Sequence, residues 1–187
     1  MILDIINKIK GDLEESFKHI FVWFDTNEDS INYKPENSGW SIAQILEHIS
    51  ITNHYLLILI KKGTLKAIEK SKNISFAELV ENYELDWIKL EAVGTHKSFE
   101  WNRPEHMEPK VVNNLIEVRE KLEFQLNECL AILEQMPNGE GILSTTTMSV
   151  NGLGKIDVYH YIYFLVQHAK RHLTQMQMVK LGLENKK

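Results

Sequence analysis

Two histidines lie four residues apart near the end of the chain, in the stretch QHAKRHLTQ at residues 167–175. In an α-helix, residues four apart are offset by only about 40°, because each residue turns by about 100°. His168 and His172 would therefore project from neighbouring turns of one helix face, where two imidazoles can share a metal ion. The chain holds 8 histidines in 187 residues. Chance gives about 0.3 such pairs in a chain of this composition, so the spacing alone leaves packing and surface roles open.

A third histidine, His48, lies in the stretch SGWSIAQILEHIS at residues 38–50. Like the pair of His168 and His172, it falls at the margin of an apolar stripe, and such margins border the interior of a helical bundle. Ordinary hydrogen bonding or packing is the alternative for each of the three. The residues between the paired histidines, AKR, lack the Glu of an HExxH metallopeptidase, which excludes a zincin mechanism.

Other polar residues near the three histidines could contribute to a site. His54, Tyr55, His160 and Tyr161 are candidates only by their position along the chain, and for His160 we expect a surface or packing role. Arg171 points about 100° away from the histidine that follows it. It could bind an anion, but we favour exposure to solvent. The sequence identifies no proton donor, so the catalytic residues stay unassigned.

Long helices would be needed to position these side chains, and apolar residues at three- and four-residue steps predict them. Ser41 and Gln44 fit a capping box at one helix start, and Gly63 marks the expected end of that helix. Gly139 and Gly182 fit the ends of the two later helices. The predicted long helices comprise residues 2–24, 42–63, 115–133 and 157–181.

The segment between the second and third long helices is a crossover of dozens of residues. The stretch SFAE at residues 75–78 could begin a shorter helix there, whereas residues 94–109 look irregular. We expect Trp87 and Trp101 to cover this crossover. Residues 144–150, STTTMSV, are interpreted as an extended loop. The pattern predicts an all-α, four-helix bundle with a long crossover between helices two and three, in a single domain at residues 1–187.

Composition excludes several classes of protein. The apolar share of 43% and charged share of 25% are those of a globular protein, and the net charge of -5 without a basic stripe argues against nucleic acid as a partner. The longest apolar run, at residues 55–60, is too short to cross a bilayer. Cys129, the single cysteine, is interpreted as a core residue, and with no signal peptide we expect a cytoplasmic location. Met176 and Met178 are interpreted as core or dimer contacts.

Five residues taken together resemble those of a known family. Trp40 and Ser41 open the second helix, His48 follows seven residues after that serine, and His168 and His172 lie on the last helix. This arrangement resembles the DinB-like family, also called the YfiT-like metal-dependent enzymes. Residues 152–177, GLGKIDVYHYIYFLVQHAKRHLTQMQ, are similar to the final segment of the family. The resemblance covers nearly the whole chain, including the helix lengths and the crossover.

The resemblance implies a four-helix bundle that holds a divalent metal through His48, His168 and His172. Neutral imidazoles suit zinc, nickel and iron, and we favour zinc or nickel. Three protein ligands would leave one position for a substrate or for water.

Family members are thiol-dependent transferases or isomerases that use thiols such as bacillithiol or mycothiol. The resemblance therefore implies a transferase that acts on a small-molecule electrophile with a low-molecular-weight thiol as co-substrate. One alternative is a non-catalytic helical scaffold for binding or stress response, for which a homodimer is a compatible assembly. Another alternative is a metal-dependent hydrolase, in which water replaces the thiol.

Overall fold

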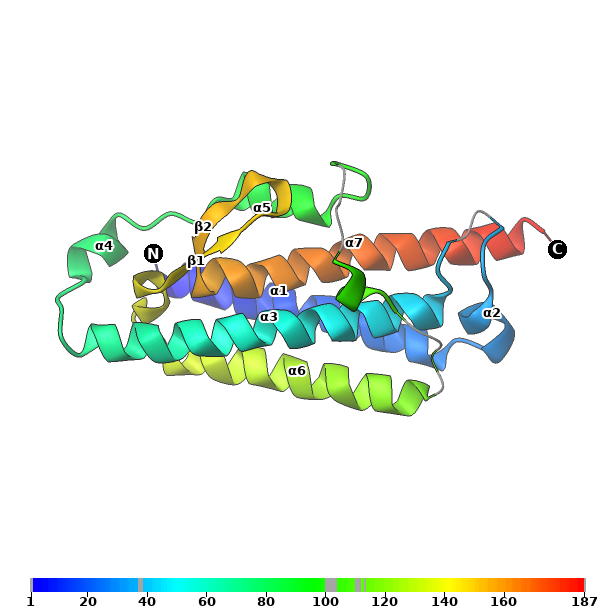
Figure 1. The fold of residues 1–187 in the computed structure, drawn as a ribbon, viewed down its shortest axis with the longest axis horizontal. Coiled ribbons are helices and arrows are strands. Elements are labelled where there is room, and N and C mark those ends of the chain that lie inside the picture. The colour runs from blue at the N-terminus through cyan, green and yellow to red at the C-terminus, as the bar shows by residue number, and fades with distance from the viewer. Residues whose placement is uncertain (1, 37–38, 100–103, 110–111, 113, 187) are drawn as a thin grey trace.

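The computed structural model describes residues 2–36, 39–99, 104–109, 112 and 114–186. Four long helices pack side by side within these residues: α1 (Ile2–Val22), α3 (Ile42–Ser71), α6 (Leu115–Gln135) and α7 (Val158–Glu184). α1 and α7 run in one direction, and α3 and α6 run in the opposite direction (Figure 1). The predicted all-helical class and four-helix bundle are confirmed, and the observed bounds lie within a few residues of those predicted for three of the four helices.

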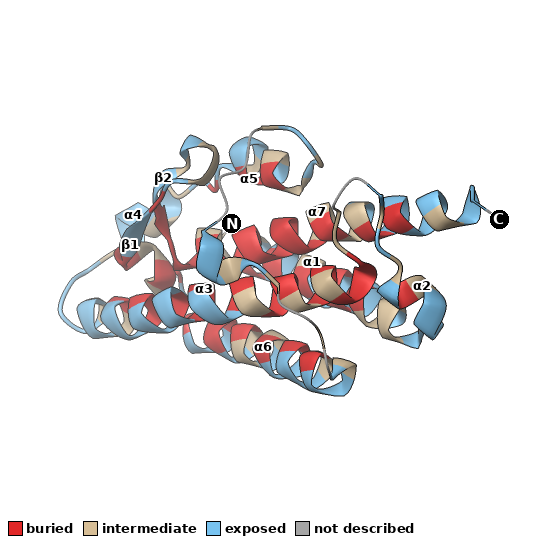
Figure 2. Cartoon of the chain, turned by 45° about the vertical axis from the view of Figure 1, so that its right-hand side comes forward, coloured by how far each residue is buried: buried red, intermediate tan, exposed pale blue. Residues whose placement is uncertain are grey.

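The core lies where the apolar stripes of these helices meet, and Figure 2 shows their buried faces in red. Ile9 and Leu13 of α1 and Leu46 of α3 have no exposed surface there. α7 differs from the other helices because almost every residue from 158 to 169 is buried. The outer side of this half of α7 is covered by part of the crossover, so the half lies inside the protein rather than at its edge.

The second long helix extends further than the sequence predicted. It begins as expected, because Ser41 Oγ accepts a hydrogen bond from the Gln44 backbone and Gln44 Oε1 accepts one from the Ser41 backbone. The predicted end at Gly63 is wrong, since α3 continues to Ser71. Gly63 is buried inside the helix, and a Cβ there would lie 3.1 Å from Val158 Cγ2. This glycine therefore permits the close approach of α3 to the start of α7 instead of ending a helix.

The crossover between α3 and α6 contains three short helical elements among its described residues. These are α4 (Ala77–Glu81), α5 (Trp87–Gly94) and the 3₁₀ helix η2 (Glu105–Met107), whereas the sequence indicated one shorter helix that begins at residues 75–78. Asp86 caps the start of α5, because its side chain accepts a hydrogen bond from the Lys89 backbone. Trp87 packs at right angles against Tyr163 of α7, with ring centroids 4.8 Å apart, as expected for a residue that covers the crossover. The expectation for Trp101 lies outside the described residues.

Residues 145–148 form a strand, which corrects the extended loop expected for residues 144–150. Strand β1 (Thr145–Met148) pairs antiparallel with β2 (Gly154–Asp157) across the short 3₁₀ helix η4 (Val150–Gly152). The small sheet lies against the start of α7, where Tyr161 donates a hydrogen bond of 3.2 Å to the carbonyl of Thr147. The remaining short elements are η1 (Trp23–Asp25) and α2 (Glu28–Asn32) after α1, and η3 (Glu140–Leu143) after α6.

Cys129, Met176 and Met178 differ in how far they are buried. Cys129 is buried in the core as expected, and burial raises the pKa of its thiol to about 12. Met176 is fully buried, which fits the core role, whereas Met178 is 51% exposed. None of the helices in the described parts of the chain is long and apolar enough to cross a membrane.

Tyr159 joins the end of α6 to the start of α7. Its hydroxyl donates a 2.5 Å hydrogen bond to the carbonyl of Met136, and the ring has no exposed surface. Gly141 of η3 lies directly against this ring, because a Cβ at that position would come within 2.7 Å of the ring carbon Cε2. Gly11 of α1 is the opposite case, because a Cβ added there would have no other atom within 4 Å outside its own helical turn.

Two glycine substitutions should therefore change the free energy of unfolding in opposite directions. Gly141→Ala forces the buried Tyr159 ring to move, and we expect a loss of about 1–3 kcal/mol. Gly11→Ala removes a glycine from an exposed helix position, and we expect a gain of about 0.5–1 kcal/mol. Urea titrations followed by circular dichroism measure both values. Equal effects of the two variants would contradict the packing described for η3.

Candidate metal centre

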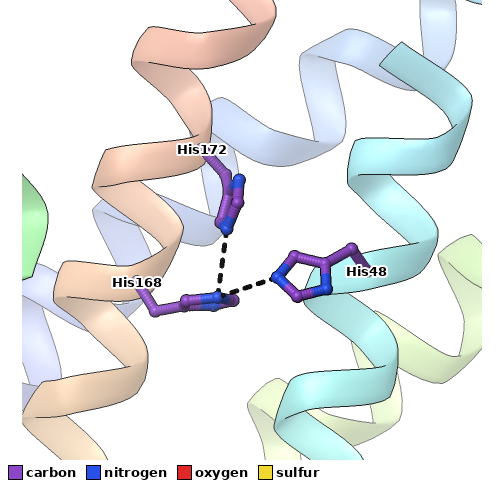
Figure 3. Close-up of side chains that lie close together, drawn as sticks. All are labelled: His48, His168 and His172. Carbon is purple, nitrogen blue, oxygen red and sulfur yellow. Dashed lines mark hydrogen bonds between the residues drawn. The ribbon is translucent and has the colours of Figure 1, made fainter. Parts of the chain in front are cut away.

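Three imidazoles from two antiparallel helices meet between α3 and α7. His48 lies in the second turn of α3, and His168 and His172 lie near the middle of α7 (Figure 3). The Nε2 atom of His168 is 3.3 Å from Nε2 of His48 and 3.0 Å from Nε2 of His172. One ligand atom from each of the three lies within 4.8 Å of the others. The structure thus brings together all three predicted site residues.

The Nδ1 atoms of His48 and His172 point away from the cluster, and their hydrogen bonds determine whether the inward Nε2 atoms carry a proton or a lone pair. Nδ1 of His48 lies 2.7 Å from the carbonyl oxygen of Met107 in η2. A carbonyl only accepts, so this Nδ1 carries the proton, and in the neutral ring Nε2 keeps a lone pair. Nδ1 of His172 lies 2.8 Å from Oε1 of Gln175, one turn further along α7. This amide oxygen also only accepts, so Nδ1 of His172 carries the proton and its Nε2 keeps a lone pair. Two of the three inward nitrogens are therefore acceptors, held in the tautomer that a metal ligand needs.

The spacing of the inward nitrogens fits a single small ion. Three nitrogens bound to zinc at about 2.0–2.1 Å in tetrahedral geometry lie about 3.3 Å from one another. The separations from His168 Nε2 to the other two Nε2 atoms, 3.3 and 3.0 Å, agree with that value. A proton on His168 can be shared with its two neighbours, but a divalent cation satisfies all three lone pairs at once. The residues present therefore fit a metal ion.

Burial keeps two of these rings neutral. The pKa of His168 lies well below its usual value, first because of burial and then because His172 and His48 lie close by. Burial is also the largest cause for His172, whose pKa falls to about 3, although the hydrogen bond to Gln175 acts in the opposite direction. Neutral imidazole is the form that binds a metal, so near neutral pH protons do not compete for these two ligands.

Aromatic side chains border the three histidines. The indole of Trp40, in the segment before α3, lies with its centroid 4.7 Å from the ring of His48. The ring of Phe164, one turn before His168 on α7, is nearly parallel to that imidazole, with centroids 6.3 Å apart. These contacts hold the imidazole planes in place and surround them with apolar atoms.

Arg171 does not simply face solvent, so that prediction needs correction. Its Nη1 donates a hydrogen bond of 2.6 Å to the carbonyl of Thr95, just after α5, and its guanidinium lies 5.4 Å from the ring centroid of Phe99. The side chain is partly buried, which lowers its pKa. Arg171 thereby connects α7 to the crossover beside the three histidines. The sequence could not show this, because the partner carbonyl belongs to a backbone about 76 residues away.

The residues that were candidates by position lie elsewhere. His160 Nδ1 is 3.0 Å from a carboxylate oxygen of Asp157 and 3.2 Å from the hydroxyl of Tyr83, which is the packing role expected for it. Tyr161 binds the small sheet through its hydroxyl. His54 and Tyr55 line a groove of about 990 Å³ between α3 and α6, together with His106 of η2. The residues lining that groove do not include the three histidines.

Two groups at the site were not identified from the sequence. The carbonyl of Met107 could not have been, because its approach to His48 depends on how the crossover folds back onto α3. Gln175 carried a weak signal, since a residue three positions after His172 on a helix lies within its reach.

The sequence of this chain matches the model of one known protein family. The family model for the DinB superfamily matches residues 18–176. The matched region includes His48, His168 and His172 and covers α3, α6 and most of α7. No curated protein and no solved structure matches the chain.

The buried imidazoles should make the metal-free protein less stable as pH falls. The unfolded chain binds protons at an ordinary histidine pKa of about 6.5, whereas folded His168 and His172 bind them only at much lower pH. Stability is therefore full above about pH 6.5 and declines below it, by up to about 1.4 kcal/mol per pH unit for each ring. We expect His172→Gln to flatten this slope in urea titrations with a chelator present.

The exposed His54 provides the control for this measurement. His54→Gln removes a histidine without removing a buried ring, so its slope between about pH 6.5 and 5 should follow that of the wild type. A His172→Gln variant with the full wild-type slope would show that the ring does not stay neutral in the folded protein.

Proposed function

This chain belongs to the DinB superfamily, and we propose that it is a divalent-metal-dependent enzyme. The observation that carries the proposal is the convergence of the Nε2 atoms of His48, His168 and His172 in one buried place. Among the described residues, no further His, Cys, Asp or Glu belongs to this group. Three protein ligands leave a position for substrate or water, which is typical of catalytic rather than structural zinc sites.

The donor set favours some metals over others. Neutral imidazole nitrogens suit zinc, nickel and iron, whereas magnesium and calcium prefer oxygen ligands. We therefore propose zinc or nickel, with iron also compatible. His48 and His172 would present Nε2 to the ion while donating Nδ1–H to Met107 and Gln175, and such outer hydrogen bonds orient metal ligands and raise their basicity.

For the reaction, we propose transfer of a low-molecular-weight thiol to a small electrophile. A bound divalent ion supplies Lewis-acid chemistry, which lowers the pKa of a thiol or of water. The rings of Trp40 and Phe164 place apolar surface around the histidines. Apolar surroundings exclude water from a site and limit competing hydrolysis, which favours a transferase over a hydrolase.

Metal binding is the first test of this proposal. We expect the purified wild type to bind about one zinc per chain, and we expect His168→Ala to bind it at least about 100-fold more weakly, because one of three ligands is lost. Isothermal titration with zinc measures both affinities, and His54→Ala serves as the matched control because that histidine is exposed and lies outside the cluster. Equally weak zinc binding by wild type and His168→Ala would refute a metal centre here.

Catalysis is the second test. With zinc or nickel bound, we expect the wild type to couple bacillithiol or mycothiol to a reactive electrophile such as chlorodinitrobenzene, and we expect turnover to stop when a chelator removes the ion. The His168→Ala variant should retain less than about 1% of the rate, because the thiol is no longer activated. Loss of free thiol and appearance of product are followed by absorbance. Turnover that continues in the chelator would rule out metal-dependent transfer.

A further inference from the structure

The groove between α3 and α6 is bordered by apolar side chains that reach solvent in a single copy of the chain. Ile58 of α3 is 53% exposed, and Phe124 of α6 is 61% exposed. Tyr55 of α3 also lines the groove, and its ring meets that of His106 in η2 edge-on, with centroids 4.6 Å apart. Single exposed apolar residues are common, but several of them along one groove indicate a surface that a partner covers.

Four groove-lining residues of α3 follow one line along the helix. They are separated by four, seven and three residues, which keeps them on one side of the helix. This spacing is the one by which one helix packs lengthwise against another. An isoleucine lies on each side of the midpoint, near residues 54 and 55, and the two ends carry opposite charges. The four are Glu47, Ile51, Ile58 and Lys61.

The two ends of this line also differ in charge on the neighbouring elements. α6 begins beside the start of α3 and runs in the same direction (Figure 1). At this end the groove lining includes carboxylates besides Glu47, and they outnumber the lysine there, Lys121. They are Glu108, Glu117 and Glu120. At the other end Lys61 forms an ion pair with Glu128, which holds its ammonium at the groove. An ammonium has three donors, so Lys61 can bind a second carboxylate.

We propose that the face around this groove binds a second copy of the chain, with the two α3 helices antiparallel across a two-fold axis near residues 54 and 55. In a two-fold interface each contact occurs twice, with the roles of the copies exchanged. Ile51 of one copy then packs against Ile58 of the other. The acidic end with Glu47 meets Lys61 of the other copy, whereas a parallel arrangement would bring like charges together. This inference goes beyond the proposed function and does not depend on the metal centre.

The size of the face is compatible with such a contact. Residues 47–65 of α3 span about 27 Å, and two neighbouring helices are about 20 Å wide. The face therefore measures on the order of 500 Å² as a flat area, and more when the relief of the side chains is included. A specific interface needs about 1,000 Å² in total from its two partners, which two copies of this face supply.

The molar mass in solution tests the proposal. Sedimentation of the full wild-type chain, at concentrations up to about 0.1 mM, should give twice the 21.8 kDa of one chain. Ile58→Glu places a carboxylate of each copy in the apolar contact, and we expect it to weaken association at least about 100-fold. Ile88→Glu is the matched control, because Ile88 is 84% exposed on α5 and does not line the groove. Circular dichroism checks that both variants are folded.

Cysteine substitutions test the antiparallel arrangement. Ile51→Cys combined with Ile58→Cys places a cysteine of one copy opposite a cysteine of the other, and a disulfide forms when the facing Cα atoms are within about 7 Å. In each single variant the two cysteines lie about 10 Å apart along the helix axis, which is too far. After mild oxidation, non-reducing electrophoresis should show a covalent dimer for the double variant alone. The native Cys129 is buried and should not react.

Three results would overturn this inference. One is a wild type that sediments as a single chain, which would leave the groove to a different partner. Another is an Ile58→Glu variant that associates as tightly as the wild type. The third is a dimer whose double-cysteine variant does not cross-link, because another face would then hold the copies together. These measurements do not involve zinc, so the metal centre and the proposed reaction would stand or fall separately.

Discussion

The antiparallel contact between α3 and α7 is the interaction on which the candidate site depends. It places His48 opposite His168 and His172 inside the bundle, where each imidazole must find a partner for its polar atoms. The outer nitrogens of His48 and His172 meet acceptors, which turns their lone pairs inward. A buried cluster of lone pairs is unfavourable in the absence of a positive charge. The packing of two helices thereby creates a place that favours a cation.

The crossover contributes to this site because of the bundle's topology. α3 and α6 run in the same direction, so the chain must travel the length of the bundle between them. On the way, η2 brings the Met107 carbonyl to His48, and the segment after α5 brings the Thr95 carbonyl to Arg171. Both contacts reach the two histidine-bearing helices from outside. The long connection therefore supplies part of the surroundings of the histidines.

Much of the fold could be predicted because its causes are local. Apolar periodicity indicated the four long helices, and a capping box at Ser41 indicated the start of α3. The errors came where a distant segment decides the local structure. Gly63 lies inside α3, where it permits the close approach of Val158, and residues 145–148 form a strand because a partner strand follows the turn. The sequence around Gly63 does not reveal that Val158 will pack there, and the sequence of β1 does not reveal that β2 will pair with it.

The sequence by itself determined that the paired histidines share one helix face, because a spacing of four residues is nearly a full helical turn. It also placed His48 at the margin of its apolar stripe, since that position follows from periodicity alone. Only the tertiary structure decided that the Nε2 atoms converge and that Arg171 binds the crossover. The reason is that ring orientation depends on hydrogen-bond partners from other segments, and their approach is a result of packing over the whole chain.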